Sequence, residues 1–109
     1  MKHISFADKT MFVTDETADL LVEYAALLGA EQSADSVRLR AIGQDGNEVE
    51  IDLVLNTSTN LASESTNSTA EAPRNEEAVE YMRTRIDAIR NPPAVEPEEL
   101  ATVDDEYRL

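Results

Sequence analysis

The side chains that most often perform catalysis are scarce in this chain. The sequence has one histidine, His3, and no cysteine. A nucleophile needs an adjacent base, which is usually histidine, and zinc sites are built mainly from histidine and cysteine. We expect His3 to be an exposed strand residue on the face opposite Ile4 and Phe6, so the sequence predicts neither a catalytic triad nor a zinc site.

Carboxylates are abundant, but each group of them has a structural explanation. Asp15, Glu16 and Asp19 fall at the start of an expected helix, where negative charge is favoured by the helix dipole. Glu50 and Asp52 alternate with apolar residues in an expected strand and face arginines across a hairpin. These pairs therefore predict no acid–base site, although a carboxylate-dependent enzyme is kept as the least favoured hypothesis.

A third acidic group lies near the C-terminus. Asp104, Asp105 and Glu106 are consecutive, and they lack the alternating ligands and turn glycine of a dedicated calcium loop. We interpret them as candidate residues for an interaction with a partner, not as a metal site.

Each of the three glycines has a structural explanation at a helix end or a hairpin turn. Gly29 follows a helical stripe and is expected to take the left-handed C-terminal cap, while Gly43 and Gly46 flank a hairpin turn. A phosphate-binding loop needs several closely spaced glycines. We predict no catalytic, cofactor-binding or metal-binding residues, and no cofactor.

The charge balance excludes further classes of function. Nine basic residues stand against 23 acidic ones in 109 residues, for a net charge of −14. Binding to nucleic acid or to an anionic membrane requires clustered lysine and arginine, so we expect neither. The longest apolar stretch, residues 20–28, is too short to cross a membrane, and no secretory signal is visible. We expect a soluble, cytoplasmic protein.

Helical spacing of apolar residues predicts two helices. The first covers residues 15–28 and begins at a cap provided by Thr14 or Asp15. The second covers residues 76–90, begins at Asn75 and contains a possible ion pair of Arg83 with Asp87 at i, i+4. The apolar stripes are Leu20, Leu21, Tyr24, Leu27 and Leu28 in the first, and Val79, Met82, Ile86 and Ile89 in the second.

Period-two alternation predicts two hairpins. In residues 3–13, a turn at Asp8 and Lys9 would place Ile4 opposite Val13, and Phe6 opposite Met11. In residues 36–56, a three-residue loop at 44–46 keeps the apolar and charged faces separate, with Gly46 in the left-handed position. It pairs Ala41 with Val49, Leu39 with Ile51, Val37 with Leu53, Arg40 with Glu50 and Arg38 with Asp52.

These elements define an α+β fold: a small antiparallel sheet of two hairpins with two helices, in the order β-β-α-β-β-linker-α. Residues 1–91 form one domain, and residues 92–109 form a mobile acidic tail. The serine-, threonine- and asparagine-rich residues 57–73 have the composition of a solvated linker. Leu61 is the only large apolar residue there, which makes it a candidate interaction residue.

Four runs resemble short actinobacterial proteins that have no established activity. They are LVEYAALL at 21–28, DGNEVEIDLVLN at 45–56, NLASESTNS at 60–68 and EYMRTRI at 80–86. The resemblance covers roughly residues 14–90 and transfers no functional residue. It implies that residues 60–68 are an ordered part of the domain, contrary to their composition.

The sequence thus favours a non-catalytic protein-interaction or regulatory domain, with a protein partner or self-association. The alternative is an acidic inhibitor, similar to an antitoxin, that blocks a basic partner. The charge is spread along the chain and concentrated only after Pro93, so solubility alone would also explain it.

Overall fold

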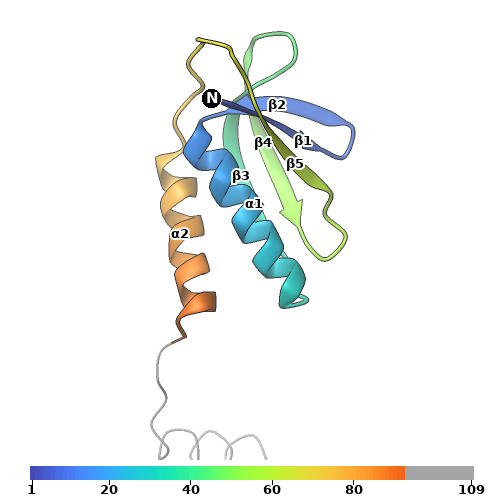
Figure 1. Cartoon of the computed structure of the whole chain (residues 1–109), viewed down its shortest axis with the longest axis vertical. Coiled ribbons are helices and arrows are strands. Elements are labelled where there is room, and N and C mark those ends of the chain that lie inside the picture. Colours follow the sequence, from blue (N-terminus) through green and yellow to red (C-terminus); the bar gives the residue numbers. More distant parts are fainter. Residues whose placement is uncertain (93–109) are drawn as a thin grey trace, which may run out of the picture.

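The computed structural model describes residues 1–92. It contains a five-stranded antiparallel sheet with strand order β4-β3-β2-β1-β5, and the helices α1 and α2 lie side by side against it (Figure 1). The α+β class expected from the sequence is confirmed. The elements are β1 (Lys2–Phe6), β2 (Lys9–Val13), α1 (Asp15–Ala30), β3 (Asp35–Ile42), β4 (Glu48–Leu55), β5 (Leu61–Ser65) and α2 (Glu76–Arg90).

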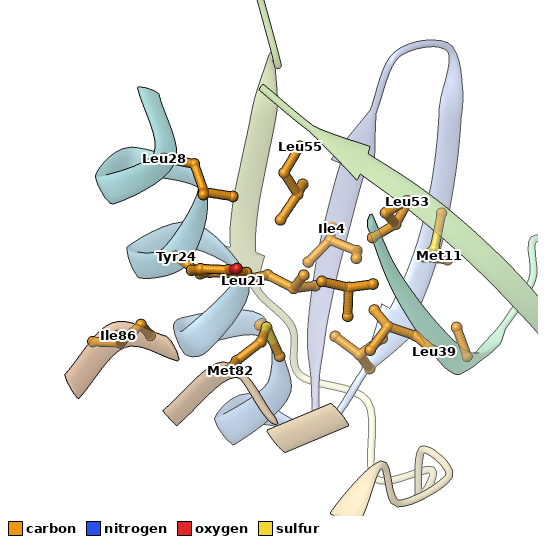
Figure 2. Packing of buried hydrophobic residues seen from close by; sticks show 14 residues of the cluster. Ile4, Met11, Leu21, Tyr24, Leu28, Leu39, Leu53, Leu55, Met82 and Ile86 are labelled. Atoms are coloured by element: carbon orange, nitrogen blue, oxygen red, sulfur yellow. The ribbon is translucent and has the colours of Figure 1, made fainter. Parts of the chain in front are cut away.

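The hydrophobic core lies between the helices and the inner face of the sheet. Tyr24 and Leu21 of α1 and Met82 of α2 meet strand residues such as Ile4 and Leu39 in one cluster (Figure 2). Every one of these side chains is almost inaccessible to solvent. Burial of this apolar surface is the main favourable contribution to folding in a domain of this size.

The β3–β4 hairpin has the predicted register. Leu39 lies opposite Ile51 and Arg38 opposite Asp52, and the Gly43 N–H donates to the Asn47 carbonyl at 2.8 Å around the three-residue loop. Gly46 has φ +86°, the left-handed value that this loop requires.

The β1–β2 hairpin differs from the prediction by two residues. Ile4 lies opposite Met11, and Phe6 opposite Lys9, because the turn is made by Ala7 and Asp8. Ala7 takes a left-handed φ of 55°, which tightens the turn one residue earlier than expected. A shift of two residues leaves the same side chains on the inner face.

Helix α1 begins as expected and ends later than expected. The Thr14 hydroxyl accepts from the Thr17 N–H at 3.2 Å, so Thr14 is the N-cap. Gly29 remains inside the helix, and Gln32 takes the left-handed position, with φ 53°. The Ser33 N–H then donates to the Leu28 carbonyl at 2.9 Å, which closes a Schellman-type C-cap.

The segment expected to be a linker contains the fifth strand. Strand β5 pairs antiparallel with β1 along its whole length, with Ser63 opposite Ile4 and Leu61 opposite Phe6. This adds an edge strand that lies next to α1. The linker prediction was wrong for these residues because pairing of the backbone does not need a strongly apolar strand.

Asn75 precedes α2 as predicted, but its side chain does not cap the helix. Strand β3 pairs with β2 only through Phe12 and Ile42. Arg40 pairs with Glu50 of β4 on one side, but on the side that faces β2 its backbone has no strand partner. The Asn75 side chain fills that place. Its Oδ1 accepts from the Arg40 N–H at 2.7 Å, and its Nδ2 donates to the Arg40 carbonyl at 2.8 Å. Asn75 therefore joins α2 to the sheet.

Candidate functional site

The structure tests the position of one predicted interaction residue. Asp104, Asp105 and Glu106 lie outside the described residues. Leu61 is half-buried at the start of β5 and packs against the core. It lines a shallow hollow of about 210 Å³ together with residues of α1, so much of its surface already contacts the same chain.

His3 lies on the outer face of the sheet, opposite Ile4, as expected from the alternation. Its ring is 5.0 Å from the ring of Phe12, measured between centroids, at a tilt of 31°. The side chain is half-buried by this contact and is less exposed than predicted. Within residues 1–92, no three His, Cys, Asp or Glu side chains are grouped closely enough to hold a metal ion.

Two of the three arginines with a predicted acidic partner pair with a different acid in the structure. Arg38 reaches Asp52 at 2.7 Å, as predicted, but Arg40 pairs diagonally with Glu48 at 2.9 Å. Arg83 does not pair with Asp87; it contacts Glu16 of α1 instead. The reason is that α1 and α2 pack side by side and bring acids of one helix next to arginines of the other.

Asp35 is the centre of a cluster that sequence reasoning missed. It stands at the start of β3, and its Oδ2 accepts hydrogen bonds from the hydroxyls of Tyr24 on α1 and Tyr81 on α2. Its Oδ1 accepts from the Ser36 N–H at 2.8 Å. The Arg85 Nε lies 3.5 Å from the Tyr24 hydroxyl. Residues far apart in sequence thus join both helices to the sheet.

The cluster shifts the pKa values of its members in opposite directions. Burial and the hydrogen bond to Asp35 raise the pKa of Tyr24 to about 12. Desolvation opposes ionisation of Asp35, but the hydrogen bonds from Tyr24, Tyr81 and the Ser36 amide outweigh it and lower the pKa of that carboxyl. Asp35 is therefore an ionised acceptor with both oxygens occupied, an arrangement suited to holding the helices in place.

A groove lies at the opposite end of the core, between the two hairpin turns. It has a volume of about 550 Å³ and is lined by the β1–β2 turn, the β3–β4 loop and residues of β2 and β4. Both turns project away from the helices (Figure 1). Met11 and Leu53 mark this end of the core, whereas Tyr24 and Ile86 lie at the other (Figure 2).

The floor of the groove is apolar and its rim is charged. Val49 and Ile51 continue the inner face of β4 beyond the helices, and Met11 borders them from β2. Val49 is 40% exposed, which is high for an inner-face valine. Asp8, Asp45 and Glu50 contribute carboxylates to the lining, and Lys9 contributes an ammonium group.

Comparisons with protein-family models, with curated proteins and with solved structures found no match to this chain. The described helices include none with the length and apolar character needed to span a membrane.

Proposed function

We propose that this protein is a non-catalytic interaction domain that binds a basic protein partner. The observation that carries the proposal is that most of its basic side chains form ion pairs within the same chain. Each of a set of basic side chains is paired with a carboxylate of the same chain, although the chain as a whole carries a charge of −14. These side chains are Lys2, Arg38, Arg40, Arg74, Arg83 and Arg90.

This pairing has a consequence for recognition. Cations engaged with neighbouring carboxylates offer little to an anionic ligand, whereas the surplus carboxylates remain for a cationic surface. A complementary charge accelerates encounter with a basic protein and disfavours acidic ones. Blocking of a basic partner, as an inhibitor does, is one form of this function, and we propose that it takes place in the cytoplasm.

The chemistry of the titratable groups supports a non-catalytic role. A general base must offer a free lone pair to a substrate within hydrogen-bond reach. Asp35 already accepts three hydrogen bonds from its own chain, which occupy three of the roughly four acceptor positions of a carboxylate. Its arrangement favours fixed packing of the helices over proton transfer.

Affinity capture with the full chain as bait tests the proposal. Lysate of the producing cells is passed over the bait and over an unrelated acidic protein of similar charge, and eluted with rising salt. We expect a protein of basic composition that binds only this bait and is released as salt screens the charges, between about 0.1 and 1 M. Recovery of only acidic proteins, or identical capture by both baits, would contradict the proposal.

Self-association is the second candidate, and a separate observation favours it. Strand β5 forms one edge of the sheet, and the Ser63 hydroxyl is buried there without a hydrogen-bond partner in the part of the chain that the structure describes. Antiparallel pairing of two β5 strands about Ser63 would place two such hydroxyls opposite each other. Light scattering over a range of concentrations tests it: a mass that stays at one chain rules it out.

A further inference from the structure

The groove between the hairpin turns lies where the sheet extends beyond the ends of the helices (Figure 1). On the inner face of β4, Leu53 and Leu55 are fully buried in the hydrophobic core. Val49 and Ile51 continue the same face by strand alternation, yet they are partly exposed. The apolar core thus opens to solvent at this end.

The walls of the groove are held by their own hydrogen bonds. The Gly46 N–H donates to the Gly43 carbonyl at 3.1 Å, and Asp45 accepts from both the backbone and the side chain of Asn47, each at 3.1 Å. A groove of about 550 Å³ falls within the size range of sites that take a small ligand or a few side chains. A ligand would therefore meet a largely preformed site, which lowers the ordering cost of binding.

The charge of the rim selects the chemistry of the occupant. The hydrogen bonds from Asn47 lower the pKa of Asp45, so this carboxylate is ionised at neutral pH. Asp8 adds a second carboxylate, and Glu50 adds a third that also pairs with Arg38 at 3.6 Å; Lys9 is a cation that lines the same groove. An apolar floor with an anionic rim fits an aliphatic side chain that has lysine or arginine next to it, and it disfavours acidic ligands.

We propose that this groove binds a protein segment in which an aliphatic side chain alternates with arginine or lysine. The aliphatic group covers Val49, Ile51 and Met11, and the flanking cations face Asp45 and Asp8. This inference rests on the proposed function, because it names the part of the domain that contacts the basic partner.

The test uses nitrogen-15-labelled full-length protein and three short probes. The first is acetyl-Arg-Leu-Arg-Leu-Arg-amide, the second replaces each leucine by glycine, and the third replaces each arginine by glutamate. We expect amide shifts at Gly43, Asp45, Val49 and Ile51 with the first probe, weaker binding of the second by about tenfold, and no shifts with the third.

Two matched variants locate the binding. Val49→Lys places a cation on the floor of the groove and should weaken the first probe by about tenfold or more. Val54→Lys makes the same change on the same strand but on the outer face, where the valine is 55% exposed, and should bind as the unchanged protein does. Circular dichroism of both variants confirms that they are folded.

The outcomes separate the groove from the broader function. Equal binding of the arginine–leucine and arginine–glycine probes, unaffected by Val49→Lys, would overturn the groove proposal and leave binding of a basic partner standing. Shifts confined to the outer face would have the same meaning. Absence of binding by both arginine probes, together with failure to capture a basic protein, would overturn both proposals.

Discussion

Substitution of Asn75 gives the sharpest test of how the sheet and α2 are joined. The Asn75 side chain is 8% exposed and makes two hydrogen bonds with the backbone of Arg40, in place of a missing strand. Asn75→Ala leaves a backbone donor and an acceptor without partners. Each unsatisfied buried group costs about 1–3 kcal/mol. Because the site is near the surface, where water can reach one of the groups, we expect a loss of about 2–4 kcal/mol in the free energy of unfolding.

The variant Asn75→Asp separates this role from helix capping. Asparagine and aspartate are about equally good N-caps, so a capping role predicts little loss of stability on this change. Aspartate keeps the acceptor for the Arg40 N–H but loses the donor and places a carboxylate oxygen against the Arg40 carbonyl. If Asn75 acts as a substitute strand, Asn75→Asp should therefore destabilise the protein by about 1–3 kcal/mol.

Urea unfolding of the full chain, followed by circular dichroism, measures both variants. Asn91→Ala is the control, because Asn91 follows α2 and, within residues 1–92, its side chain bonds only to Asp87 on an exposed surface. That change should cost less than about 0.5 kcal/mol. Hydrogen exchange at the Arg40 amide should accelerate in Asn75→Ala. An Asn75→Asp protein as stable as the original, with Arg40 still protected, would refute the reasoning.

Three further substitutions test backbone strain and the Asp35 cluster. Gln32 has a left-handed φ of 53°, which costs a non-glycine residue about 1 kcal/mol. Gln32→Gly should therefore raise the free energy of unfolding by about 1 kcal/mol in urea titrations. No gain in stability would show that the backbone is not strained at this residue. Asp35 has a lowered pKa, so its stabilisation is present above the unfolded value near 4 and is lost as pH falls below it. Asp35→Asn should flatten this part of the acid unfolding profile, and an unchanged profile would count against the cluster. Tyr24, with its pKa raised to about 12, stabilises the fold below pH 10 and loses that contribution as pH rises toward 12. The hydrogen bond to Asp35 also raises the pKa of Tyr81. Tyr24→Phe should therefore reduce the alkaline loss in a pH series of thermal unfolding, and a loss of unchanged size would contradict its assignment to Tyr24.

The two hairpins show what alternation can and cannot predict. In β3–β4, a shift of one residue would have mixed apolar and charged faces, so the pattern fixed the register. In β1–β2, the correct and predicted registers differ by two residues, and both place Ile4 and Met11 on the inner face. Period-two patterns cannot distinguish such registers. The left-handed turn at Ala7 decides between the two registers, and alanine is not a residue type that predicts such a turn.

Strand β5 and the Asp35 cluster could not be predicted for a different reason. The inner face of β5 carries Ser63 next to Leu61, so its side chains give almost no apolar signal, and its place is set by backbone pairing with β1. Tyr24, Asp35 and Tyr81 come from three elements and meet only when both helices have packed. The available signal was Tyr24 in the apolar stripe of the first helix, because a buried hydroxyl requires a partner. Tyr81 is 43% exposed and lies outside the apolar stripe of the second helix, so it gave no such signal.

Which charged residues form ion pairs is determined by the packing of the helices, and the sequence alone does not show it. The sequence predicted a pair of Arg83 with Asp87 of the same helix, but the fold pairs Arg83 with Glu16, and Arg90 with Glu23, both on α1. Such exposed ion pairs contribute little stability, typically about 0–1 kcal/mol each. Their larger effect is to neutralise charge along the interface between α1 and α2. At the hairpin end, Asp45 has hydrogen bonds from Asn47 in place of a cation, and the apolar surface of Val49 lies in the same groove. A basic partner would therefore find both charge complementarity and apolar contact there, which is the combination that a stable interface requires.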